Sequence, residues 1–195
     1  MKKTIQNLSL LSLIPILTAC GGGGSDSDVV TSAFEGTWSN ETGCEVDSVT
    51  FDGVTTIYGS YKDILTITGD SAVFDFYEYE TNNCSGESVN GKGTMNLTFG
   101  DTVDDASSIC SNAQEVNAEL VSIELEGTVY SGELLESFIE ENDGDTPSLA
   151  SFGLLCTSDD GKRIYAGDTD DESNSGQTEE TRPTTIDDEF YLVKQ

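Results

Sequence analysis

The chain has 195 residues, 37 of them acidic, only eight basic and none histidine, so its formal net charge at pH 7 is −29. A surface this acidic repels nucleic acid and anionic lipid head groups, and this excludes a nucleic-acid-binding function. Without histidine, the chain cannot build a Ser-His or Cys-His nucleophile pair, and a catalytic carboxylate pair chosen among so many acidic residues would be arbitrary. We therefore expect a protein that is not an enzyme.

The first nineteen residues have the build of an export signal. A short positive start, Met1-Lys2-Lys3, precedes an apolar run over 8–17, and this run is well short of the roughly 20 residues that span a bilayer as a helix. Leu17-Thr18-Ala19-Cys20 then resembles the bacterial lipobox. The resemblance implies a diacylglyceryl thioether on Cys20, cleavage before it, and a fatty acyl group such as palmitate on the new amine. An ordinary secretory signal with a chance cysteine is the alternative.

The acylated cysteine and a flexible tether are predicted over 20–32. Four glycines follow Cys20, then serine and aspartate, with no side chain that could pack. Two or three acyl chains anchor a protein stably, and the Gly/Ser/Asp stretch from Gly21 to Asp28 reaches about 16 Å. In Gram-negative lipoproteins of this kind, aspartate after the cysteine favours the inner membrane. Gly21 is not that signal, so the resemblance implies the outer membrane, at its periplasmic or cell-surface face.

Residues 33–195 are expected to form a single β domain. Loss of the two signal lysines leaves six basic residues and takes the net charge from −29 to −31, and about 165 residues are enough for one domain with a substantial core. Apolar and polar residues alternate as in half-buried strands, and turn residues separate the runs. The expected strands lie at 63–68 and 72–80, joined by a Gly-Asp-Ser turn, and at 93–99, 121–125, 154–157, 162–166 and 190–194.

Three other segments depart from this alternation. Apolar residues at helical spacing predict a short helix over 134–139 that closes one end or packs against the sheet. Residues 140–147 and 168–182 are too acidic and polar to pack, so we expect loops. The second loop offers oxygen ligands for calcium, but a solvated acidic loop is the favoured interpretation, with no metal and no cofactor. The calcium candidates are Asp168, Asp170, Glu172 and Glu179.

Four cysteines remain after Cys20: Cys44, Cys84, Cys110 and Cys156. An even number in an exported chain predicts two disulfides, for which three connectivities exist. We favour Cys44–Cys84 with Cys110–Cys156, because each bond would then staple one half of the domain.

The motif Phe-Glu-Gly-Thr-Trp at 34–38 resembles the Gly-x-Trp signature of lipocalins, here Gly36 and Trp38. Together with the paired cysteines and the closing segment RPTTIDDEFYLVKQ, it also resembles a group of lipoproteins from marine proteobacteria. The resemblance implies an all-β, lipocalin-like antiparallel β-barrel of roughly eight to ten strands with one short helix; a β-sandwich is the alternative. The Thr-Asp-Tyr motif of true lipocalins is missing. In such barrels the tryptophan closes one end and a basic residue lies across its ring, either Lys194, which we favour, or Arg182.

A barrel of this size can hold one small ligand or be filled by its own side chains. We expect a monomer that binds a small apolar ligand and contacts the membrane only through its lipid anchor. A structural or protein-interaction lipoprotein with a filled barrel is the alternative. The candidate inward-facing residues are Phe74, Phe76, Tyr77, Tyr79, Met95, Leu97 and Phe99.

Overall fold

The computed structural model describes residues 31–51, 54–104, 106–110, 113–141, 150–169, 173 and 175–195. The predicted signal, Cys20 and nearly all of the tether lie outside the described residues, so the anchoring predictions stay predictions.

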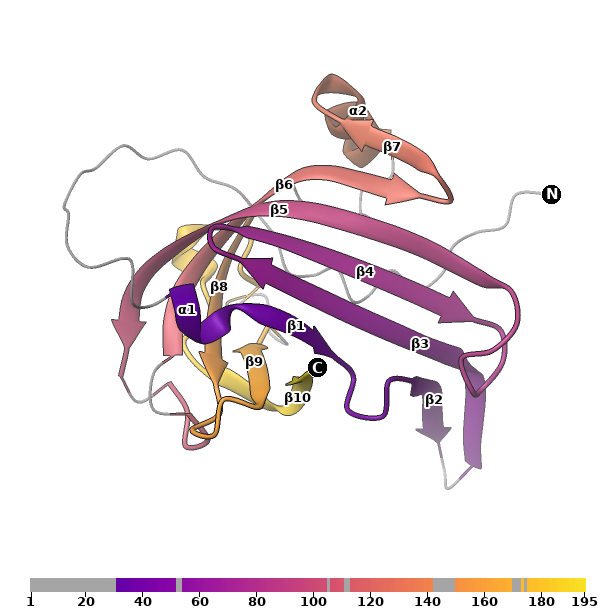
Figure 1. Cartoon of the computed structure of the whole chain (residues 1–195), viewed down its shortest axis with the longest axis horizontal. Helices are drawn as coiled ribbons and strands as arrows, with labels where there is room; N and C mark the ends of the chain where they lie inside the picture. The colour runs from indigo at the N-terminus through magenta and orange to yellow at the C-terminus, as the bar shows by residue number, and fades with distance from the viewer. Residues whose placement is uncertain are drawn as a thin grey trace.

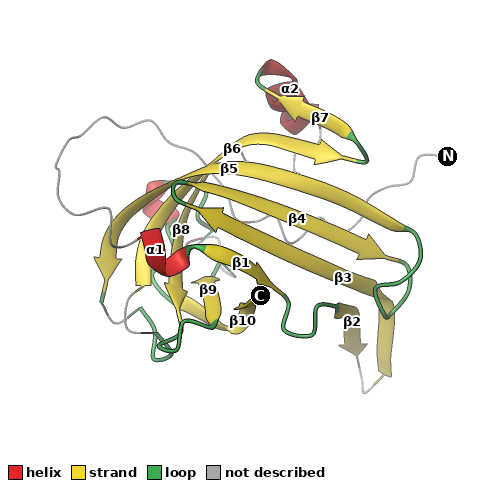
Figure 2. Ribbon diagram, in the orientation of Figure 1, coloured by secondary structure: helices red, strands yellow, loops and turns green. Residues whose placement is uncertain are grey.

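Strands dominate the described chain (Figures 1 and 2). The strands are β1 (Gly36–Ser39), β2 (Glu45–Phe51), β3 (Val54–Thr68), β4 (Ser71–Tyr79), β5 (Ser88–Val103), β6 (Ala113–Leu125), β7 (Thr128–Ser131), β8 (Ala150–Thr157), β9 (Arg163–Gly167) and β10 (Ile186–Lys194). Three helical segments accompany them: α1 (Thr31–Phe34), α2 (Glu133–Glu141) and the 3₁₀ helix η2 (Glu179–Thr181).

Eight of these strands close into an antiparallel barrel in the order β1-β3-β4-β5-β6-β8-β9-β10. The short strand β1 completes the circle, because Trp38 is in register with Lys194 of β10 on one side and with Leu65 of β3 on the other. The remaining two strands lie outside the circle, β2 against β3 and β7 against β6. The predicted all-β barrel with one short helix is confirmed, and this closure rules out the alternative β-sandwich.

The predicted β3–β4 hairpin is confirmed, and Thr68 pairs with Ser71 across its turn. The strands are longer than the alternation indicated, since β3 begins at Val54 rather than near residue 63. The early part of β3 reads Thr-Thr-Ile-Tyr-Gly-Ser-Tyr-Lys, with too few apolar residues to show a period of two. This early part of β3 extends past the short strand β1, toward the right of Figure 1.

One apolar cluster fills much of the barrel and takes residues from all eight barrel strands. The ring of Phe34 in α1 stacks on Phe99 of β5 with centroids 5.4 Å apart, so α1 packs into one end. The fully or largely buried members are Phe34, Trp38, Ile67, Ala72, Met95, Leu97, Val116, Leu120, Ile123, Leu135, Ala150, Ile164 and Leu192.

Five of the seven predicted inward-facing residues do face the interior. Phe76, Met95 and Leu97 are buried, and Phe74 and Phe99 pack against the cluster. The prediction is wrong for Tyr77 and Tyr79, which are only half-buried and not part of the cluster. They alternate with Phe74 and Phe76 along β4, and successive side chains of a strand point to opposite faces.

The predicted helix is α2, and it packs on β7, above β6 in Figure 1. Leu135 is 2% exposed within the interior cluster, and the rings of Phe138 and Tyr130 lie 4.4 Å apart. In the part of the chain that the structure describes, no helix has both the length and the apolar character to cross a bilayer.

Both favoured disulfides are present, Cys44–Cys84 and Cys110–Cys156. The first joins the start of β2 to the connection between β4 and β5. The second joins the β5–β6 connection to β8 and lies in a separate buried cluster on the outer side of β8 and β9. Each bond therefore ties a different part of the domain to the barrel, as predicted for the favoured pairing.

The prediction that 168–182 does not pack is wrong for its second half. Strand β9 pairs with β8 only from Leu155 to Thr157, so the Phe152 N–H has no β9 partner and donates instead to the Gly176 carbonyl at 3.1 Å. Pro183 is fully buried. We call residues 175–183 the strap, since they cover this edge of β8.

Candidate functional site

Trp38 is fully buried at the end of the barrel where α1 packs, which we call the Trp38 end. Its indole N–H donates to the Phe34 carbonyl at 2.9 Å, so the polar atom of the ring is satisfied. The Lys194 ammonium lies over the ring, 4.9 Å from its centroid. At Gly36, with φ of 140°, a Cβ would come within 2.8 Å of Lys194 Cε. Glycine here therefore permits both the backbone conformation and the position of Lys194.

The basic partner of Trp38 is thus Lys194, as favoured, and not Arg182. The Arg182 guanidinium lies on the outer face, 5.2 Å from the centroid of the Phe152 ring. It donates to the carbonyls of Val116 and Gly153 at 3.3 and 3.0 Å and to Asn117 Oδ1 at 2.7 Å. Arg182 therefore fastens the strap to β6 and β8.

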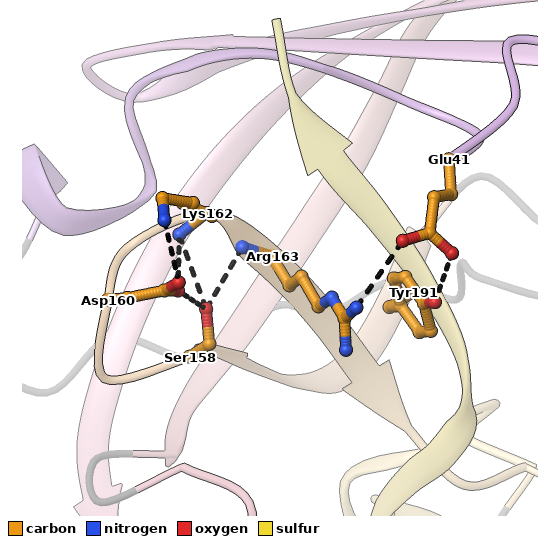
Figure 3. A network of polar contacts seen from close by, with 6 residues as sticks. All are labelled: Glu41, Ser158, Asp160, Lys162, Arg163 and Tyr191. Carbon is orange, nitrogen blue, oxygen red and sulfur yellow. Dashed lines mark hydrogen bonds and ion pairs between the residues drawn. The ribbon is translucent and has the colours of Figure 1, made fainter.

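A polar clasp holds the connection between β1 and β2 against β9 and β10 (Figure 3). Glu41 accepts from the Tyr191 hydroxyl at 2.6 Å and pairs with Arg163 at 3.4 Å. The guanidinium of Arg163 also lies over the Tyr191 ring, 4.3 Å from its centroid. Each exposed contact contributes little stability by itself. Together they hold the chain next to Asn40, the residue before Glu41, which is 2% exposed.

Beyond the apolar cluster, the inward strand face of β3 and β4 becomes acidic, and β2 extends this surface past the barrel circle. Antiparallel register places Tyr61 of β3 opposite both Glu45 of β2 and Glu78 of β4, and residues directly opposite share a face. Asp63 follows two residues later on that face, in line with the core residues Leu65 and Ile67. We call this surface the acidic face: Glu45, Asp47, Tyr61, Asp63 and Glu78.

Asp63 is the deepest carboxyl of the acidic face, with 2% of its surface exposed. Asn40 Oδ1 accepts its backbone N–H at 2.6 Å. The side-chain oxygen Oδ2 is buried and has no hydrogen-bond partner. Buried carboxyl oxygens are almost always paired, because an unpaired one loses its hydration without compensation. Among the described residues, Gln114 Oε1 is the other buried side-chain oxygen without a partner, so Asp63 is the one carboxyl group in this state.

Burial and nearby negative charge oppose ionisation of Asp63 and Glu78, the two carboxyl groups of the acidic face whose pKa is raised. Burial, with the nearby charge of Glu78, raises the pKa of Asp63 to about 7, although hydrogen bonding from Asn40 works in the opposite direction. Burial and the charge of Asp47 raise the pKa of Glu78. Burial also raises the pKa of Tyr61, assisted by Asp63 and the two acidic residues of β2. These groups lie close together where water is partly excluded, so a positively charged neighbour would stabilise their ionised forms.

An aromatic residue, Phe76, lies opposite Asp63 on the neighbouring strand. Phe76 of β4 is in register with Asp63 and with Gly91 of β5. The Phe76 ring occupies the space where a Cβ on Gly91 would lie, next to Leu125. Glycine at this position therefore leaves room for the Phe76 ring over β5.

The alternative of a calcium site in the acidic loop gains no support. Asp170 and Glu172 lie outside the described residues, Asp168 donates its N–H to the Thr185 carbonyl, and Glu179 is an exposed residue of η2. Within the described ranges, no three Cys, Asp or Glu side chains are grouped so that they could hold a metal ion.

Sequence reasoning missed Asn40 and Asp63. A usable signal exists for Asp63, since it falls at an inward position of the pattern Tyr-Lys-Asp-Ile-Leu-Thr-Ile, in phase with Leu65 and Ile67. Asn40 gives no such signal, because its role depends on the closure of β1 onto β3.

No protein-family model matches the chain, and no curated protein matches it either.

Proposed function

We propose that this protein is a non-catalytic, outer-membrane-anchored lipoprotein whose barrel binds a small, largely apolar ligand. The observation that carries the proposal is the incompletely satisfied interior beyond the apolar cluster, where the buried Asp63 Oδ2 has no partner. Binding sites in barrels of this size combine apolar walls with a few inward polar groups. Phe76 and Leu125 would supply the wall, and Asp63 the polar group.

Anchoring through Cys20 rests on the Leu-Thr-Ala-Cys motif and the glycine tether. The tether would join the barrel at the Trp38 end, because α1 directly precedes β1. The acidic face would then lie away from the anchor. We expect Cys20→Ser to move the protein from the membrane fraction to the soluble fraction of cells. A protein that stays in the membrane with unchanged mobility would refute the anchor.

Ligand binding is tested by titrating the soluble domain, residues 28–195, with the neutral dye N-phenyl-1-naphthylamine. We expect a saturable fluorescence increase with one site per chain, reversed by octanol, whereas unfolded protein gives none. Native mass spectrometry of protein purified from cells provides a second measurement, since a bound small molecule would add mass. No saturable response together with no added mass would overturn the proposed binding.

A structural or protein-interaction lipoprotein is the second candidate. The specific observation that favours it is the apolar cluster itself, to which all eight barrel strands contribute. Under this function the barrel is a rigid scaffold, and the dye titration separates the two candidates.

A further inference from the structure

The acidic face has an excess of negative charge that the protein itself does not balance. All six basic residues beyond the predicted signal are described, and none lies on this face. Lys62 alternates with Tyr61 and Asp63 along β3, so it points to the outer face. Lys92 pairs with Asp75 at 3.4 Å on that same outer face. The others pair with Asp160, Glu41 and Glu115 or lie over Trp38: Lys162, Arg163, Arg182 and Lys194.

The buried oxygen of Asp63 is a second and independent observation. A buried carboxyl group with a purely structural role would be expected to form hydrogen bonds through both of its oxygens. Asp63 Oδ2 forms none. Asp63 lies on the strand face that continues into the barrel core. Glu78 of β4 is close enough for its charge to raise the pKa of Asp63. The carboxyl groups of Asp63 and Glu78, the first with an unpaired oxygen, therefore lie together on one inward surface.

The neighbouring rings favour an organic cation. Phe76 is in register with Asp63 across the β3–β4 pair, and Tyr61 lies two residues from Asp63 on the same strand face. Ammonium groups are attracted to aromatic faces as well as to carboxylates. A metal ion would instead need three or more converging oxygen ligands, an arrangement that the described Asp and Glu residues do not form.

We propose that the acidic face binds the positively charged head group of a small amine, with Asp63 as its deepest carboxylate and Glu78 beside it. This inference rests on the proposed function, because the apolar part of the same ligand would lie along Phe76 and Leu125. It adds the charge of the ligand, which the barrel fold alone does not specify.

Three probes with the same hydrocarbon chain isolate the head group: octylamine, octanol and octanoate. In calorimetric titrations of the soluble domain at pH 7 and 0.15 M salt, octylamine should bind with at least tenfold higher affinity than octanol. Octanoate should not bind. The ammonium requires Asp63 to be ionised, so protonated Asp63 releases a proton when the amine binds. Titrations in two buffers of different ionisation enthalpy should detect this release. Other titratable groups also face the bound head group: Glu78 of β4, Tyr61 of β3, and Glu45 and Asp47 of β2.

Two variants separate the site from the general acidity of the protein. Asp63→Asn should remove the tenfold preference for octylamine, and Glu78→Gln should weaken it. Asp75→Asn is the matched control, since Asp75 lies on the outer face of β4, and it should keep the preference. Asp63→Asn should fold, because it removes a buried charge; circular dichroism verifies this, and Glu78→Gln provides the same test if it does not.

The outcomes distinguish the inference from the proposed function. If octanol and octylamine bind equally, the amine assignment is wrong while the ligand-binding function stands. If none of the probes binds, the ligand-binding function fails as well. Octylamine binding that is unchanged in Asp63→Asn would reveal general attraction to an acidic surface and overturn the site. Saturable calcium binding that is lost in Asp63→Asn would overturn the organic cation.

Discussion

The Trp38 end and the acidic face belong to the same barrel but satisfy their polar atoms very differently. At the Trp38 end, the indole N–H has an acceptor in Phe34 and the ring has a cation above it in Lys194. On the acidic face, Asp63 is as deeply buried as most core residues but leaves one oxygen unpaired. The first arrangement is what stability alone favours, whereas the second costs free energy.

This difference separates the part of the barrel that holds the fold together from the part that is available for function. Unsatisfied buried groups persist where another requirement outweighs stability. Changes at the Trp38 end should therefore reduce stability at every pH, while changes on the acidic face should alter the pH dependence and even raise stability.

The largest loss is expected for Trp38→Ala. Truncating a fully buried tryptophan leaves a cavity and removes the hydrogen bond to Phe34. The free energy of unfolding should fall by about 3–5 kcal/mol. Urea unfolding followed by far-ultraviolet circular dichroism measures it. A loss below about 1 kcal/mol would show that Trp38 does not anchor the core.

The two disulfides offer a comparison in which loop length is nearly constant. Their sequence separations are 40 and 46, so each bond should contribute about 2–4 kcal/mol by constraining the unfolded chain. Cys110 and Cys156 are 7% and 0% exposed, whereas the other pair is only half-buried. Replacing Cys110 and Cys156 with alanine should therefore cost about 1 kcal/mol more than replacing Cys44 and Cys84, because it also leaves a cavity. Equal losses in urea unfolding would contradict this role for burial.

Much of this architecture could be predicted from the sequence. Alternation at Met95, Leu97 and Phe99 predicts an inward face, and the Gly-x-Trp resemblance predicts both the barrel and the position of Lys194. The acidic face could not be predicted, because it depends on register between β2, β3 and β4. The strap was missed because its packing comes from a backbone edge on β8 and a single guanidinium, that of Arg182, rather than from apolar residues.

Asp63→Asn tests the acidic face through pH. The pKa of Asp63 is raised to about 7 in the folded protein from an ordinary value near 4, so the folded state binds the proton more tightly than the unfolded chain. Its contribution is therefore fully present below about pH 4 and is lost as the pH rises through 7. The raised pKa of Glu78 acts in the same direction.

We expect Asp63→Asn to reduce the loss of stability between pH 4 and 8 and to be more stable than the unmodified protein at pH 8, by on the order of 2 kcal/mol. Urea unfolding at a series of pH values measures both. Asp75→Asn, on the outer face, is the control and should leave the pH profile nearly unchanged. A profile for Asp63→Asn that parallels that of the unmodified protein would show that Asp63 is not the titrating group.

The smallest effect concerns the contact between Lys194 and Trp38. An ammonium above an indole ring at an exposed site contributes about 0.5–1 kcal/mol, and Lys194 is exposed. A double-mutant cycle with Trp38→Phe and Lys194→Met isolates this term, since the core packing of residue 38 cancels between the two arms.

Arg182→Met provides the matched control. It should destabilise the protein by releasing the strap from the carbonyls of Val116 and Gly153, yet show no coupling to Trp38, because Arg182 lies over Phe152 on the outer face. Coupling of Trp38 to Arg182 in place of Lys194 would show that Lys194 is not the basic residue that contacts the Trp38 ring. Coupling to neither would leave Trp38 as a core residue held only by packing and its hydrogen bond to Phe34.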